Sequence, residues 1–163
     1  MTYHLRPVGL DFLATAPVRL VFDAWVPAPR AAVFAAVTDD PANWSWFPTV
    51  SGGCYEGDGP YGVGSRRQVR AIGVRMRETV MAWDEPARWA YRVDETAIPM
   101  SRALLEGWDF EGDGGRTLVR WTLAADPVPP FGLPLRSGRP IIGRVFRRGM
   151  RNLAAELTSH HLG

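Results

Sequence analysis

Six short segments of alternating polar and apolar residues follow one another in the middle of the chain, and one long amphipathic segment ends it. The alternation predicts strands, and the short breaks between them favour an antiparallel sheet. The predicted strands span residues 50–56, 64–72, 74–83, 88–95, 102–111 and 116–125. A sheet with one apolar face must cover that face, so we expect the C-terminal segment to pack on it as a helix.

The chain before this run predicts one more strand and two short helices. Residues 18–26 alternate in the same way and predict the first strand. Residues 30–37 carry apolar side chains at helical spacing. Residues 39–47 predict a second short helix, with Asp39 or Asp40 as its N-cap.

The C-terminal segment, residues 140–161, predicts one long helix with an apolar stripe and a surface crowded with arginine. The stripe contains Ile142, Phe146, Gly149, Leu153 and Leu157. The arginines are Arg144, Arg147, Arg148 and Arg151. They indicate either the ordinary solvent-facing side of the helix or contact with a membrane surface. Residues 126–140, rich in Pro and Gly, predict the loop before this helix.

The length of 163 residues indicates one domain. We expect residues 18–163 to form it and residues 1–17 to be a mixed lead-in. The net charge of +2 is too small to predict a nucleic-acid partner. No apolar run approaches the roughly 18 residues of a membrane span, so we expect no stable membrane insertion. The lead-in lacks a signal-peptide pattern, and we expect a cytoplasmic location.

Recognisable catalytic and cofactor motifs are absent from the sequence. Cys54 is the only cysteine, so no intrachain disulfide can form. His4, His160 and His161 do not stand at ligand spacing with Cys or carboxylates, so we predict no metal site. No Gly-x-Ser-x-Gly element and no nucleotide-binding glycine loop occur. We therefore predict no cofactor, and the sequence assigns no catalytic residue.

Three stretches together resemble a known superfamily. Residues 26–39 form a proline-containing entry to a helix that ends in Thr-Asp, and residues 39–48 form a Trp-rich segment that ends in Pro. Residues 78–93 form a strand, a Pro-Ala-Arg turn and a second strand. With the order of elements over residues 18–161, they resemble the START-like (SRPBCC) superfamily with the helix-grip fold. The resemblance is strongest to its polyketide cyclase/dehydrase-type branch.

This resemblance implies an α+β fold. Seven antiparallel strands would form a curved sheet wrapped around the long C-terminal helix, with two short helices after the first strand. Members of the superfamily bind lipids, steroids, polyketide intermediates or hormones in an internal cavity, and some catalyse cyclisation. The superfamily has no universal catalytic motif, so the resemblance assigns no residue role here.

Polar residues on the predicted strands are the candidates for chemistry, namely Glu78, Tyr91, Glu106 and Arg120. We predict that at least one lines a cavity between sheet and helix. There it could orient a ligand oxygen or act as a general acid or base. The alternative is a set of Glu–Arg pairs on the solvent face. Strand 116–125 leaves the choice open, because either Arg120 or its neighbour Trp121 can face inward.

Four further residues are predicted to line the same cavity, namely Trp89, Trp108, Phe146 and Gly149. Gly149 stands on the apolar stripe of the last helix, where a ligand could approach the backbone. The seven Trp and seven Phe residues provide large apolar surface, either for such a pocket or for an ordinary core.

Three hypotheses about function follow. The first is a binding domain, for transport or sequestration of a small apolar ligand such as a lipid or polyketide-like compound. The second is a polyketide cyclase/aromatase- or dehydratase-type enzyme that uses acid and base residues in the cavity. The third is an interaction module whose cavity is filled by its own side chains. A homodimer is compatible with all three.

Overall fold

The structure is a computed structural model that describes residues 1–160, including every side chain among them except that of Asp113. The helices and strands are β1 (Tyr3–His4), α1 (Phe12–Thr15), β2 (Val18–Val26), α2 (Arg30–Thr38), the 3-10 turn η1 (Pro41–Asn43), β3 (Val50–Tyr55), β4 (Arg66–Ala71), β5 (Val74–Asp84), β6 (Arg88–Thr96), β7 (Ser101–Asp113), β8 (Arg116–Pro127), α3 (Gly132–Ser137) and α4 (Arg139–His160).

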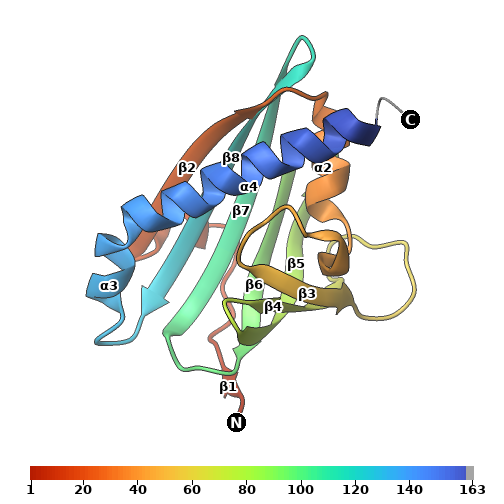
Figure 1. Cartoon of the computed structure of the whole chain (residues 1–163). Coiled ribbons are helices and arrows are strands. Elements are labelled where there is room, and N and C mark those ends of the chain that lie inside the picture. The colour runs from red at the N-terminus through yellow and green to blue at the C-terminus, as the bar shows by residue number, and fades with distance from the viewer. Residues whose placement is uncertain (161–163) are drawn as a thin grey trace.

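One curved antiparallel sheet carries the fold, and α4 crosses its concave side (Figure 1). The strand order is β2-β8-β7-β6-β5-β4-β3, so consecutive strands pair except where β2 joins β8. The seven-stranded sheet and the C-terminal helix confirm the fold class that the sequence predicted. Within the described residues the sheet has an eighth strand, because β1 pairs with β6 through Tyr3 and Thr96.

The N-terminal lead-in packs on the convex face of the sheet. Phe12 of α1 joins Ala103, Leu105 and Ala124 in a small apolar cluster there. Leu13 lies over Gly107, where an added Cβ atom would come within 3.0 Å of its Cδ1 atom. This contact explains why a glycine stands in the middle of β7.

The second short helix predicted over residues 39–47 is present but shorter, as the 3-10 helix η1 (Pro41–Asn43). It ends before Trp44 and Trp46, which are both buried. Two residues apart on a longer helix, they would point to nearly opposite sides. The carboxylate of Asp40 accepts a hydrogen bond from the N–H of Ala42 at 2.9 Å, so Asp40 is the cap.

The loop predicted over residues 126–140 contains the short helix α3. Its Pro134 stands in the first turn, where a missing N–H costs no intrahelical hydrogen bond. The long helix follows directly as α4, and its predicted end at residue 161 lies outside the described residues.

The inner core lies between α4 and one half of the sheet. Phe146 packs against the rings of Phe22, Trp108 and Trp121 at centroid distances of 6.1, 6.1 and 5.7 Å. Gly149 lies against Phe47, whose Cδ2 atom would be 2.9 Å from a Cβ atom at that position. Glycine on the buried stripe therefore lets the ring of Phe47 approach the helix backbone.

Candidate ligand-binding cavity

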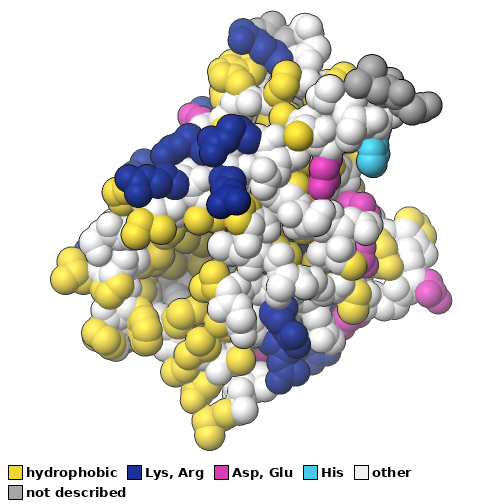
Figure 2. All heavy atoms as spheres, in the orientation of Figure 1, with side chains coloured by type: hydrophobic (Ala, Val, Ile, Leu, Met, Phe, Trp, Pro, Cys, Tyr) yellow, Lys and Arg dark blue, Asp and Glu magenta, His cyan; other side chains and the backbone are white. Residues whose placement is uncertain are grey.

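A cavity of about 540 Å³ lies between the concave face of the sheet and the α3–α4 segment. Its volume is within the range of sites that hold small molecules. Its walls are mostly apolar; they include Val69, Met76, Leu104, Leu123, Ala125, Ile142 and Val145. In Figure 2 a hollow with hydrophobic walls is visible below the arginines of α4.

The sizes of the inward side chains explain why the space between α4 and this part of the sheet is not filled. Along β7 the inward positions change from Leu104 to Trp108 and Phe110, and along β8 they change from Ala125 to Trp121. The small residues stand at one end of the two strands and the aromatic rings at the other. The open end of the cavity therefore lies where β7 begins and β8 ends, beside α3.

Glu106 is a polar side chain at the inner end of this apolar cavity. Its Oε2 atom accepts a hydrogen bond from the Tyr91 hydroxyl at 2.5 Å and another from Trp121 Nε1 at 2.9 Å. Tyr91 is the register partner of Glu106 across β6 and β7, so the antiparallel pairing places the two groups together. The pair can present a carboxyl group to a ligand oxygen in a site that is otherwise apolar.

Arg67 and Glu78 form a buried ion pair beside this group. They are register partners on β4 and β5, and Arg67 Nε donates to Glu78 Oε2 at 2.6 Å. Their side chains are 1% and 3% exposed. The guanidinium lies over the rings of Trp44, Trp89 and Tyr91, with its central carbon 5.2, 4.6 and 4.4 Å from their centroids. Such contacts stabilise a cation that is removed from water.

Burial raises the pKa of both carboxyl groups. It raises the pKa of Glu78 to about 7, although the charge of Arg67 acts against this. It also raises the pKa of Glu106, against the hydrogen bonds from Tyr91 and Trp121. Burial likewise holds the pKa of the Tyr91 hydroxyl well above its ordinary value. Because two carboxyl groups share one guanidinium, the cluster favours keeping a proton on one of them.

Four of the eight residues predicted for the site line the cavity, namely Glu78, Tyr91, Glu106 and Trp108. Their part in binding a ligand stays a prediction. Sequence reasoning missed Arg67, although the alternation of β4 buries it together with Val69. Its position opposite Glu78 was the available signal.

The prediction that Arg120 lines the cavity is wrong. Arg120 lies on the outer face of β8, where its Nε atom is 2.9 Å from a carboxylate oxygen of Asp23. Trp121, the alternative inward residue of this strand, lines the cavity instead. The sequence left both faces possible because α1 also buries Ala124 on the outer face of the strand.

Three apolar candidates are buried but do not border the cavity. Trp89 lies beneath the guanidinium of Arg67, and Phe146 lies within the aromatic core. Gly149 is covered by Phe47, so no ligand can approach the backbone there. These three predictions are wrong because aromatic side chains from distant segments already occupy the positions.

The part of the chain that the structure describes contains neither a metal-binding cluster nor a membrane-spanning helix. No three His, Cys, Asp or Glu residues gather closely enough to hold a metal ion among residues 1–160, and His161 lies outside them. No described helix is long and apolar enough to cross a membrane.

Comparison with known proteins relates the chain to others over most of its length. An uncharacterized protein of Mycobacterium tuberculosis is 26% identical over 152 residues, which are 93% of this chain and 91% of that protein. A START superfamily protein from Mycobacterium smegmatis superposes with a TM-score of 0.70 at 14% identity, over 86% of this chain and 97% of that one.

A major latex-like protein from Panax ginseng superposes with a TM-score of 0.64 at 16% identity, over 85% of this chain and 96% of that one. At such identities the two structures show a common fold only. The family model described as "Polyketide cyclase / dehydrase and lipid transport" matches residues 18–158. Because that match spans the sheet from β2 onward and nearly all of α4, the chain belongs to this family, and its START-like fold confirms the resemblance seen in the sequence.

Proposed function

We propose that the protein binds a small, mostly apolar molecule, such as a lipid or a polyketide-like compound, in this cavity. One oxygen of the ligand would form a hydrogen bond at the Glu106–Tyr91 pair. The observation that carries the proposal is an apolar cavity of about 540 Å³ with a carboxyl group at its inner end. The family description, which includes lipid transport, supports the same class of ligand.

The open cavity argues against the hypothesis of a ligand-free interaction module. That hypothesis requires the chain's own side chains to fill the space, whereas the aromatic residues fill only the other half under α4. An apolar ligand in this space would remove its walls from water and make many van der Waals contacts with them.

Fluorescence titration with N-phenyl-1-naphthylamine, a neutral apolar probe, tests the binding proposal. Leu104→Trp adds a large ring inside the cavity, and we expect it to weaken probe binding at least about tenfold. Glu111→Trp adds the same ring on the exposed outer face of the same strand and should leave binding unchanged. Equal affinity of wild type and Leu104→Trp would contradict the proposal.

A specific observation favours a second candidate function, an enzyme of the cyclase or dehydratase kind. Two carboxyl groups with raised pKa values, Glu78 and Glu106, line one cavity. Perturbed pKa values in a cleft are typical of acid–base catalysis. In a dehydration, one carboxylate would remove a proton next to a ligand carbonyl. One carboxylic acid would protonate the hydroxyl that leaves as water.

Native mass spectrometry of the purified protein and its variants distinguishes the two functions. If the protein is a dehydratase, Glu106→Gln should retain a compound that is heavier by one water molecule than the compound in wild type. Glu111→Gln, on the outer face of the same strand, should retain the wild-type compound. The same compound in all three proteins would contradict dehydration and support binding alone.

A further inference from the structure

Exposed apolar side chains surround the mouth of the cavity on two sides. Ile72, at the tip of the turn between β4 and β5, is 68% exposed. Across the mouth, Leu133 of α3 is 76% exposed and Ile141 of α4 is 63% exposed. Ile72 and Ile141 also line the open end of the cavity itself. Large apolar side chains grouped in this way at a polar surface mark a binding surface.

The backbone at Ile72 makes this tip unusual. Its φ angle is 47°, in the left-handed region that β-branched residues avoid. Glycine or asparagine would occupy the position with less strain. Isoleucine at this position therefore costs backbone strain, and its exposed side chain recovers little of that cost through packing within the chain.

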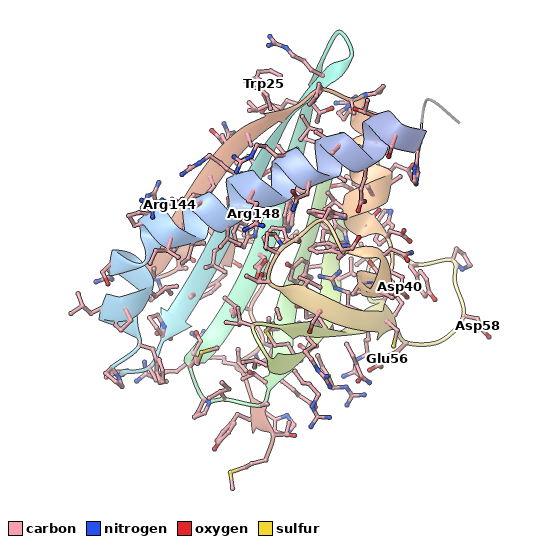
Figure 3. The ribbon with its side chains drawn as sticks, in the orientation of Figure 1. Trp25, Asp40, Glu56, Asp58, Arg144 and Arg148 are labelled. Carbon is pink, nitrogen blue, oxygen red and sulfur yellow. The ribbon has the colours of Figure 1, made fainter. Side chains whose placement is uncertain are left out.

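Arginines flank one side of the mouth along α4. The exposed residues are Arg144, Arg147, Arg148 and Arg151. No ion pair with a described residue neutralises any of the four, and the single acidic residue of the helix is Glu156, near its C-terminal end. Figure 2 shows a dark blue band of Arg side chains over α4 beside the hollow, and Figure 3 shows Arg144 and Arg148 projecting from the helix.

A second pair of arginines flanks the opposite tip. Arg70 and Arg75 stand directly opposite each other across β4 and β5, next to the turn that carries Ile72, and both are exposed. Like charges in direct cross-strand positions destabilise a sheet. Each apolar tip of the mouth is therefore bordered by positive charge.

We propose that the rim of the cavity mouth docks on the surface of an anionic lipid bilayer. Ile72, Leu133 and Ile141 would enter the interfacial region, and the arginines of α4 would face the anionic headgroups. Basic residues that border exposed apolar side chains bind such surfaces through both contributions. The apolar side chains stand on two sides of a hollow and form no continuous flat patch. A lipid surface can deform to meet both sides at once. The net charge of +2 provides no general attraction for polyanions, so the local pattern carries the proposal.

Sedimentation with vesicles tests the docking, and it depends on no ligand in the cavity. We expect the protein to bind vesicles of phosphatidylcholine with phosphatidylglycerol at low salt. Binding to phosphatidylcholine alone should be weaker by at least tenfold. High salt should weaken the anionic binding, because exposed charges are screened. Failure to bind anionic vesicles at low salt overturns the proposal and leaves the binding function of the cavity untouched.

Two pairs of charge reversals locate the surface. Arg144→Glu with Arg148→Glu should weaken anionic binding by more than about tenfold, at about fivefold for each lost basic residue. Arg30→Glu with Arg66→Glu makes the same change in net charge at exposed positions away from the mouth. The control pair should retain more than half of the wild-type affinity. Equal losses in both pairs would overturn the proposed position of the surface.

The apolar tips are tested by Ile72→Asn with Leu133→Ser. Asparagine accepts the left-handed backbone at position 72 and Leu133 is 76% exposed, so neither substitution should unfold the chain. We expect this variant to bind anionic vesicles several-fold more weakly at both salt concentrations, with a thermal midpoint no lower than that of wild type. Wild-type binding by this variant would show that the rim does not enter the bilayer. If wild type binds no vesicles but forms a dimer that these two substitutions disrupt, the surface binds a second copy of the chain and the proposal is overturned.

Discussion

The space between α4 and the sheet has two halves that differ although the same helix and strands build both. In one half, Phe47 lies against Gly149, and Phe146 lies against Trp121 at a centroid distance of 5.7 Å, so aromatic rings fill the space. In the other half, Leu104, Ala125 and Ile142 border a cavity of about 540 Å³. The position of the cavity is therefore decided by the volumes of the inward side chains, together with Phe47 from the segment between η1 and β3.

The polar cluster stands at the boundary between these halves. Arg67, Glu78 and Glu106 border the cavity on one side, and Trp44 and Trp108 pack beside them on the other. The aromatic half keeps water away from the carboxyl groups and raises their pKa values, while the open half leaves room for a ligand next to them. Three predictions test this division.

The largest effect is expected from Arg67→Met. It removes the cation that pairs with buried Glu78, and breaking one side of a buried pair costs about 3–5 kcal/mol of the free energy of unfolding. Arg88→Met breaks an exposed pair with Asp109 and should cost about 1 kcal/mol or less. Urea denaturation measures both. Similar losses would show that the cluster is not isolated from water.

The second prediction concerns pH. The pKa of Glu78 in the folded protein, about 7, is above its ordinary value of 4.5, so the folded state binds the proton more tightly. The resulting stabilisation is complete below about pH 4.5 and is lost as the pH rises through 7.

Glu78→Gln removes this dependence. The free energy of unfolding of wild type relative to this variant should fall by on the order of 3 kcal/mol between pH 4.5 and pH 8. Glu111→Gln, at an exposed position, should show no such change. If the difference in the free energy of unfolding between wild type and Glu78→Gln does not change with pH, water reaches the Glu78 carboxyl group and its pKa is not raised.

The third prediction compares added volume in the two halves. Gly149→Val places methyl groups against the ring of Phe47 and should cost about 2 kcal/mol, because a packed core tolerates extra atoms poorly. Leu104→Trp adds a larger group on the open side and should cost about 1 kcal/mol or less. Thermal and urea unfolding measure both. A larger loss for Leu104→Trp would mean that the cavity is closed in solution.

The sequence predicted those parts of the site that depend on local periodicity. The alternation along β7 placed Glu106 and Trp108 on one inward face, and the alternation along β5 did the same for Glu78. The apolar stripe of α4 predicted the buried face of the helix. Side chains at alternate strand positions, or three and four residues apart on a helix, share a face in any fold.

Tertiary structure decided the parts that depend on distant segments. The sequence of β8 allows either Arg120 or Trp121 to face inward, because α1 covers part of the outer face and makes apolar residues acceptable on both sides. Gly149 lay on the correct stripe, yet Phe47 covers it. Arg67 is buried beside Glu78 because aromatic rings from two distant segments surround its charge, namely Trp44 and the β6 residues Trp89 and Tyr91. Periodicity specifies the face on which a residue lies, whereas what meets that face is set by packing between segments far apart in the chain.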